Sequence, residues 1–490
     1  MGASGDDSHC AYPSRRGDAR LRSWQEELVE RKFLPMTHLM IASKSGKILY
    51  DHVTGTVNAA NAEWEAFENA NDGGNVKIPE RRRSIGAAVD CPHDALYRIY
   101  SMTKPITCVA IMQLFEQGKL LLSDPVWKYL GDKWKKKNQS VWDRKGGGGN
   151  GSEIFSVVKC RRSITVKHLL THQSGISYGF DKYGFANKVD KEYYSRGLYP
   201  GGSQRAQWDG TLADFVDRLA EMPLCFQPGT AWMYGFNIDV LGRIVEVISG
   251  MPLAEYFRQN IFEPLGMNST SYFVAEQNVG RFTKVTKRAG QAAGMLALGT
   301  AGGTKKWELC DFSKLAGDAS NKYRPRPLHS AFCEGGSGLV STTSDYMQFC
   351  VALLNGGAAP DGARILGEHT VKFMTMNHLY DREGRACCIR DLSPNIPGYS
   401  ESYAPGVGFG LGMSVVVDEA KSQQMASAGA FSWGGAASTA FWCDPASGIA
   451  VVFMTALLFR DDYALPLRPL LQSQVYANVD SLSEMRSSKL

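Results

Sequence analysis

Strand-like segments at both ends of the chain, with helical patterns between them, constrain the fold most strongly. Residues 38–53 predict two short strands joined by a Ser-Gly turn. Three further strand-like segments follow in the final third, at 408–417, 438–443 and 449–459. The 490-residue chain therefore predicts one sheet built from both ends, with a mainly helical region inserted. No internal repeat is visible.

The helical patterns lie in the interior of the chain. Residues 105–119 are apolar on nearly every face, and the pattern stops at Gly118, which predicts a buried helix with a glycine cap. Amphipathic patterns follow at 164–175, 211–222 and 239–250. The first of these helices is expected at the centre of the domain, because it has no polar face.

Two polar stretches interrupt these patterns, at about 57–92 and 133–160. We interpret the first as an irregular insertion and the glycine-rich part of the second, 135–151, as a flexible surface excursion. Both carry basic clusters without the interleaved aromatic residues of a nucleic-acid surface. With a net charge of only +5, we expect no nucleic-acid partner.

Composition narrows the class of protein further. A chain with 44% hydrophobic and 21% charged residues is typical of one or two well-packed globular units. The longest apolar run, 448–459, is too short to span a membrane and suits a buried strand. The eleven cysteines form no CxxC pair, so we expect a reducing compartment, no metal site and no cofactor.

The segment SMTK carries the clearest chemical signal. A serine becomes a strong nucleophile when a neighbouring base takes its proton, and a lysine serves as that base where its environment lowers its pKa. Ser101 and Lys104 stand three positions apart, so on a helix they share one face. Pro105 places the pair in the first helical turn. We predict Ser101 as the nucleophile and Lys104 as its activator.

A second SxxK pair, Ser156 with Lys159, provides an internal control. About two such matches are expected by chance in a chain of this length. The second pair follows the glycine-rich stretch in strand-like text, where positions three apart point to opposite faces. Only the first pair has the geometry that the chemistry requires.

The text around Ser101, YRIYSMTKPIT, resembles the serine β-lactamase and penicillin-binding superfamily. The similarity is to its class C and family VIII carboxylesterase branches and to the lovastatin-type acyltransferases. Segments at 164–176, 223–250, 336–357 and 431–453 look like that family in its usual order. The resemblance implies an α+β, β-lactamase–transpeptidase-like fold with an antiparallel sheet flanked by helices.

The resemblance covers most of residues 34–480 outside the two insertions. We expect an N-terminal extension at 1–33, one catalytic domain at 34–480 and a tail at 481–490. Within the domain, the sheet region is expected at about 34–100 and 335–480, and the helical region at about 101–334.

The family's second motif, Tyr-x-Asn, corresponds to Tyr234-Gly235-Phe236. The resemblance implies that Tyr234 moves protons between nucleophile and leaving group. Phe236 replaces the motif's asparagine and is expected at the substrate, where it cannot hydrogen-bond an amide. Asn237 precedes a helical pattern with Asp239 in its first turn, so we predict Asn237 as the helix N-cap.

The family's third motif, Lys-Thr-Gly, is replaced by Trp433-Gly434-Gly435, as in the esterase branch. The glycines let a substrate approach the strand backbone. By resemblance, the amides of Ser101 and Ala436 form the oxyanion hole. The lost lysine would have paired with a substrate carboxylate, so an apolar ester suits the site better than an anionic β-lactam.

Four functions remain open on these residues. A carboxylesterase would attack with Ser101, form an acyl-enzyme and release the acyl group to water. An acyltransferase would pass the same group from an ester or thioester to an alcohol. The same residues would also suit a β-lactamase or peptidase-type hydrolase, or a catalytically silent binding protein on the same fold.

Two other active-site patterns fit less well. An α/β-hydrolase elbow at 430–434 fails because that fold needs a histidine after its serine, whereas the last histidine is His378. His168 and His172 are spaced like a metal pair, but their helix has no HExxH sequence. We interpret both histidines as structural.

The chain ends in Ser488, Lys489 and Leu490, the tripeptide that the peroxisomal import receptor reads. We therefore expect a peroxisome or related microbody, or the cytosol where this signal is not read. The N-terminus has no apolar signal region, and Asp6 stands where a myristoylation signal needs serine or threonine.

Overall fold

Both ends of the chain contribute strands to one sheet, as the sequence predicted. The computed structural model describes residues 12–57, 90–145, 154–179, 188–198, 210–288, 309–311, 332–393, 405–458 and 466–483. Its strands are β1 (Met36–Ser43), β2 (Ile48–Gly55), β3 (Tyr97–Arg98), β4 (Ser140–Lys145), β5 (Ile154–Lys159), β6 (Thr286–Arg288), β7 (Leu309–Asp311), β8 (Val340–Ser341), β9 (Val407–Phe409), β10 (Ser414–Val416), β11 (Phe431–Gly434), β12 (Ala440–Asp444) and β13 (Ile449–Met454). Seven of them pair antiparallel in the order β2-β1-β13-β12-β11-β10-β9.

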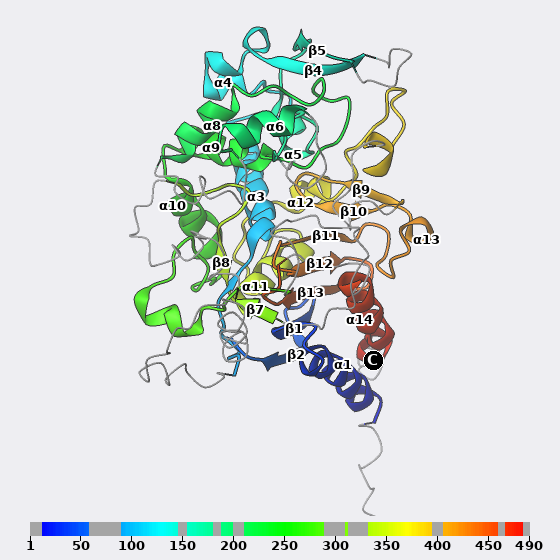
Figure 1. Cartoon of the computed structure of the whole chain (residues 1–490). Helices are drawn as coiled ribbons and strands as arrows, with labels where there is room; N and C mark the ends of the chain where they lie inside the picture. The colour runs from blue at the N-terminus through cyan, green and yellow to red at the C-terminus, as the bar shows by residue number, and fades with distance from the viewer. Residues whose placement is uncertain are drawn as a thin grey trace, which may run out of the picture.

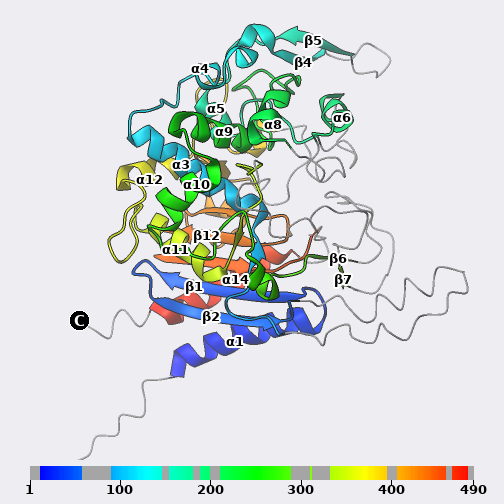
Figure 2. The same cartoon turned by 90° about the vertical axis from the view of Figure 1, so that its left-hand side faces the viewer.

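The α-helices of the described residues pack on the two faces of this sheet or on one another. They are α1 (Tyr12–Glu30), α3 (Thr103–Glu116), α4 (Trp127–Leu130), α5 (Val166–Leu170), α6 (Lys188–Ser195), α8 (Leu212–Leu219), α9 (Asn237–Ser249), α10 (Leu253–Phe257), α11 (Thr343–Leu354), α12 (Glu368–Met374), α13 (Glu419–Ser422) and α14 (Leu467–Ser483). In Figures 1 and 2, α1 and α14 lie against one face, and α11 and the inserted helices lie beyond the other. This arrangement confirms the predicted fold class.

The alternation of side chains along the central strands explains the two packed layers. In β13, Ile449, Val451 and Phe453 point toward α1 and α14, whereas Val452 and Met454 point into the main core. All six residues of β13 are buried, because helices cover both faces. This double burial accounts for the continuous apolar run in the sequence.

Helix α3 lies at the centre of the main core, as predicted. Its residues from Thr103 to Leu114 are all buried, and it packs against α9 and α10. The helix ends before Gly118, whose φ of 67° lies in the left-handed region that glycine tolerates. Burial on all sides fixes the direction of this helix and therefore the position of the residues at its start.

Part of the predicted flexible excursion is a hairpin. Ser140–Lys145 pairs antiparallel with Ile154–Lys159, so the expected flexible excursion is wrong for β4, whereas the strand expected around residues 156–159 is confirmed as β5. The strand gains backbone partners from β5, and the Trp142 amide donates to the Leu224 carbonyl at 2.9 Å. The polar composition concealed these partners. Residues 58–89 and 146–153, in the two predicted insertions, lie outside the described residues.

A membrane-spanning helix would need about twenty consecutive apolar residues. Within the described ranges, no helix is both long and apolar enough to cross a bilayer. Ser488, Lys489 and Leu490 lie outside these ranges.

Candidate active site

Ser101 lies in a short 3-10 turn, Tyr100–Met102, directly before α3. Tyr100 has φ of 44°, in the left-handed region where a side chain is strained. The surrounding structure holds this turn in place, since the Tyr346 hydroxyl donates to the Met102 carbonyl at 2.9 Å. Ser101 itself is only partly buried. The fold thus places this hydroxyl at the N-terminal end of the central helix α3.

Lys104 extends from the first turn of α3 to Ser101. Its Nζ donates to Ser101 Oγ at 3.1 Å and to the Gly336 carbonyl at 2.6 Å. The side chain is 1% exposed. The hydrogen bond to the Gly336 carbonyl fixes the position of the amine beside the serine hydroxyl. The structure therefore brings the predicted nucleophile and activator together.

The Gly336 segment leaves no room for a side chain beside Lys104. A Cβ at Gly336 would lie 2.7 Å from Asp239 Oδ2 and 3.3 Å from Lys104 Nζ. The Gly336 amide donates to Asp239 Oδ1 at 3.2 Å, and the Asp239 carboxylate is buried. Asp239 lies in the first turn of α9, as predicted. The sequence placed Gly336 in a family-like segment but gave no sign of its contact with the lysine.

Tyr234 faces the same lysine. Lys104 Nζ lies 4.7 Å from the centroid of the Tyr234 ring and 5.4 Å from that of Tyr178, within the range of a cation–π interaction. The two tyrosine rings are 5.1 Å apart. Tyr178 was not predicted, because its distance in sequence from both partners conceals the contact.

Phe236 does not reach the surface of the site. Its ring is fully buried, 4.5 Å from Tyr178 and 5.0 Å from Phe215. A side chain at the intervening Gly235 would overlap the Ile176 carbonyl, so the backbone there packs tightly. The structure thus places Phe236 behind Tyr178, and not in the position expected for a substrate contact.

The predicted N-cap role of Asn237 is wrong. Helix α9 begins at Asn237, Phe236 occupies the cap position, and no side chain caps the helix. The fully buried Asn237 amide instead donates from Nδ2 to His172 Nδ1 at 2.9 Å, and its Oδ1 accepts from the Ser174 hydroxyl. A buried amide needs hydrogen-bond partners. His172 and Ser174 satisfy both ends of the Asn237 side chain, whereas a cap would use only its oxygen.

His172 and His168 have structural surroundings. Burial, with a smaller effect from the Lys104 charge, holds the pKa of His172 well below its usual value. His168 takes part in a capping box, in which its Nδ1 accepts from the Thr165 amide at 3.2 Å. Burial, assisted by the charges of Arg162 and Lys167, lowers the pKa of His168 to about 4. Neither histidine belongs to a group of metal-ligating side chains within the described ranges.

The glycines after Trp433 allow the end of β11 to approach Ser101. A Cβ at Gly435 would overlap Thr439 Oγ1 and lie 2.5 Å from the Ile99 carbonyl oxygen. Ala436 packs in a small apolar cluster that also includes Tyr100. The predicted oxyanion donors, the amides of Ser101 and Ala436, therefore belong to two segments that contact each other.

Arg468, from the first turn of α14, lies beside this strand. A side chain at Gly434 would overlap the guanidinium, whose Nη2 donates to the Thr439 carbonyl at 3.0 Å. Burial lowers the pKa of Arg468 to about 10, and the electrostatic influence of Tyr234 acts in the opposite direction. Trp433 completes the group with its ring 5.4 Å from that of Tyr234. No motif in the sequence pointed to Arg468.

This geometry agrees with a family assignment. The model of the Beta-lactamase family matches residues 40–475. The chain belongs to the Beta-lactamase family. The segments that resembled the family in sequence thus lie within one matched region.

Three relatives show the range of this family. Protein Rv1367c of Mycobacterium tuberculosis is 32% identical over 76% of this chain and 80% of its own length. Esterase EstB of Burkholderia gladioli is 26% identical over 78% and 83%. The monacolin J acid methylbutanoyltransferase of Aspergillus terreus is also 26% identical, over 78% and 82%.

A solved structure gives the same fold. EstCE1, described as a hydrolase with promiscuous acyltransferase activity, superposes with a TM-score of 0.66 at 20% identity. The match covers 95% of this chain and all of EstCE1. Family and relatives together indicate a serine hydrolase or acyl-transferring enzyme.

Proposed function

We propose that the protein hydrolyses carboxylic esters through an acyl-enzyme on Ser101. The observation that carries this proposal is the position of Lys104 Nζ, 3.1 Å from Ser101 Oγ and anchored to the Gly336 carbonyl. A base held in place at this distance from a hydroxyl can take its proton as the bond to carbon forms. The same arrangement has no evident use in a protein that only binds.

In the first step, Ser101 Oγ attacks the ester carbonyl carbon while its proton moves to Lys104, which acts as the base in its unprotonated form. The carbonyl π electrons become the oxyanion of a tetrahedral intermediate. Amides of Ser101 and Ala436 would stabilise this charge, and one such donor contributes about 3 to 4 kcal/mol. The oxyanion then collapses, and the bond to the leaving alcohol breaks.

Tyr234 would return the proton to the departing alkoxide. Its ring centroid lies 4.7 Å from Lys104 Nζ, so the tyrosine is next to the group that holds the proton in this step. Attack of water on the acyl-enzyme repeats the sequence in reverse and restores the Ser101 hydroxyl. Each proton taken from the nucleophile is thereby delivered to the leaving group.

The surroundings favour an apolar acyl ester over an anionic β-lactam. Trp433 stands where the family motif has a lysine, and aromatic rings surround Tyr234. Arg468 supplies a cation at this strand, but its Nη2 is bound to the Thr439 carbonyl. A β-lactam should therefore be tested as a substrate beside the esters.

Acyl transfer to an alcohol is the second candidate. It uses the same acyl-enzyme and is favoured by the similarity to a methylbutanoyltransferase. The two reactions differ in product: free acid without an added acceptor supports the hydrolase. Negligible acid together with an acceptor-dependent new ester supports the transferase.

A substrate series tests this proposal. p-Nitrophenyl esters of increasing chain length and a chromogenic cephalosporin are offered to the wild type and to Ser101→Ala. We expect ester turnover by the wild type and its loss in the variant. Cephalosporin turnover far above ester turnover would reject the substrate assignment, and full activity in Ser101→Ala would reject the mechanism.

For the location of this activity, we propose the peroxisome on the strength of the SKL tripeptide. The terminal residues 481–490, fused to the C-terminus of a fluorescent protein, are expected to direct it to peroxisomes. Deletion of Leu490 from the fusion should leave it in the cytosol. Identical distribution of the two fusions would reject the proposal.

A further inference from the structure

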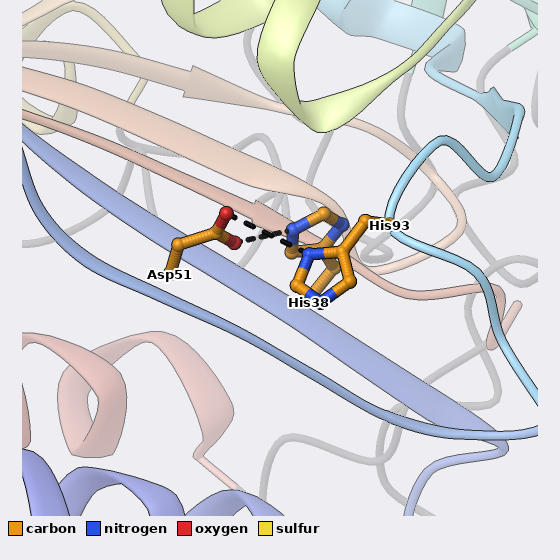
Figure 3. A group of neighbouring side chains, drawn as sticks. All are labelled: His38, Asp51 and His93. Carbon is orange, nitrogen blue, oxygen red and sulfur yellow. Dashed lines mark hydrogen bonds and ion pairs between the residues drawn. The ribbon is translucent and has the colours of Figure 1, made fainter.

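We propose that His38, Asp51 and His93 form a binding site for Zn²⁺ or a similar first-row divalent cation. Figure 3 shows the Asp51 carboxylate directed at both imidazole rings. His38 Nε2 lies 2.8 Å from Asp51 Oδ1, and His93 Nδ1 lies 3.6 Å from Asp51 Oδ2. One donor atom from each residue lies within 4.8 Å of the others. The site is separate from the proposed chemistry at Ser101.

The sheet register places the first two residues together. Asp51 on β2 pairs with Met40 on β1, so His38, two residues from Met40, is the diagonal neighbour on the same face. His38 is fully buried, in a row with the core residues Met36 and Met40. Such a position normally holds an apolar residue, and the His38 Nδ1 has no partner among the described residues.

His93 reaches the pair from the turn that precedes β3. The backbone around it is fixed, because the Cys91 amide donates to the Gly55 carbonyl at 2.9 Å and Arg281 donates to the Asp94 carbonyl at 2.7 Å. The His93 side chain is 65% exposed, whereas that of Asp51 is 32% exposed. The ring of His93 can therefore rotate toward an ion while its backbone stays in place.

The donor set determines the class of ion. Two imidazoles and one carboxylate are the ligands of many zinc sites, and imidazole disfavours Mg²⁺ and Ca²⁺. Tetrahedral ligands at about 2.0 to 2.1 Å from zinc lie about 3.3 Å apart, so donors within 4.8 Å of one another can meet one ion if the exposed ring of His93 moves inward. Zn²⁺ would take the Nε2 position of neutral His38, whose ring proton moves to Nδ1. Exposure of His93 leaves the fourth position to water.

A metal here would join the N-terminal hairpin to the segment that leads to Ser101, eight residues after His93. The three ligands form no spaced motif, so no metal site was predicted from the sequence. An ion that closes the long segment between Asp51 and His93 is expected to stabilise the folded chain.

Calorimetric titration of the chelator-treated full-length protein with Zn²⁺ tests the site. We expect one ion per chain, and affinity at least tenfold weaker in His93→Ala and in Asp51→Asn. Asparagine at 51 still accepts a hydrogen bond from His38, so this variant removes the charge and keeps the pairing. The exposed His369, on α12, supplies the matched control, and His369→Ala is expected to bind as the wild type does.

Two further measurements guard against binding elsewhere, especially at cysteine. Co²⁺ bound at this site should show no thiolate charge-transfer band, and its visible spectrum should change in His93→Ala. Zn²⁺ should raise the thermal midpoint of the wild type but not of His93→Ala. Absence of saturable binding, or equal affinity in wild type and His93→Ala, would overturn the proposal. Neither result bears on ester turnover by Ser101.

Discussion

The Cβ position of Gly435 lies 2.5 Å from the carbonyl oxygen of Ile99, two residues before Ser101. Real Cβ and carbonyl oxygen atoms do not approach this closely. The strand that carries one proposed oxyanion donor is therefore packed directly against the backbone that carries the nucleophile. The two segments can lie this close only because Gly435 has no side chain.

Gly435→Ala is expected to push these two segments apart. Because a shift of about 1 Å in a reacting group can cost about 100-fold in rate, we expect a loss of this order in kcat/KM. Steady-state kinetics on the best p-nitrophenyl ester measure it. Gly280→Ala is the control, since a Cβ there would meet nothing within 4 Å; equal activities in the two variants would contradict the packing argument.

Lys104→Met removes the proposed base and keeps most of its volume. We expect kcat/KM to fall by about 10² to 10⁴, the usual contribution of a positioned base. The Gly336 carbonyl loses its donor, which should also lower the free energy of unfolding by about 1 to 3 kcal/mol. The exposed Lys119 offers the control Lys119→Met. A folded Lys104→Met variant with wild-type kinetics would exclude the lysine as activator.

Tyr234→Phe removes the hydroxyl and keeps the ring, so it distinguishes the role of one from that of the other. The ring should retain its contacts with His172 and Trp433, while proton delivery to the leaving group is lost. We expect kcat to fall by about 10² to 10⁴ with little change in thermal midpoint. Tyr193→Phe, a buried tyrosine 6.5 Å from the Phe236 ring, should leave kcat unchanged. Similar kcat values for the two variants would contradict a role for the phenol.

His168 should make the fold sensitive to acid. Its pKa is about 4 when folded and about 6.5 when unfolded, so the unfolded chain binds the extra proton below pH 6.5. Its contribution to stability is present above that pH and is lost as pH falls toward 4. His168→Gln keeps the capping box without a titrating group. Urea unfolding at pH 7.5 and 4.5 should show a smaller loss in this variant; equal losses would contradict the assignment.

Sequence patterns predicted most of the architecture because it depends on local periodicity. The hairpin of β1 and β2, the buried helix α3 and the return of strands near the C-terminus all follow from local runs and patterns of apolar residues. The strand at residues 156–159 was predicted and lies in β5, whereas its partner β4 was missed, since the polar segment beside the glycine-rich stretch gave no strand pattern. Asn237 was misassigned because a cap and a buried amide have the same sequence appearance.

In the site, too, contacts between residues close in sequence were predicted and contacts between distant residues were not. Ser101 and Lys104 lie three residues apart, in a 3-10 turn and the helix that directly continues it, so their spacing predicts their contact. Gly336, Tyr178 and Arg468 reach the site from other elements, and only the packing of those elements reveals them. The cluster of His38, Asp51 and His93 likewise depends on strand register and on a turn about forty residues away in sequence.

The covalent intermediate on Ser101 is the central claim, and mass spectrometry of a rapidly quenched reaction tests it most directly. The protein is mixed with a p-nitrophenyl ester, denatured in acid and digested, and the peptides are compared with those of Ser101→Ala. We expect one acyl group, on the peptide that contains Ser101, and no adduct in the variant. Acylation of another residue, or ester turnover that persists in Ser101→Ala, would contradict the account.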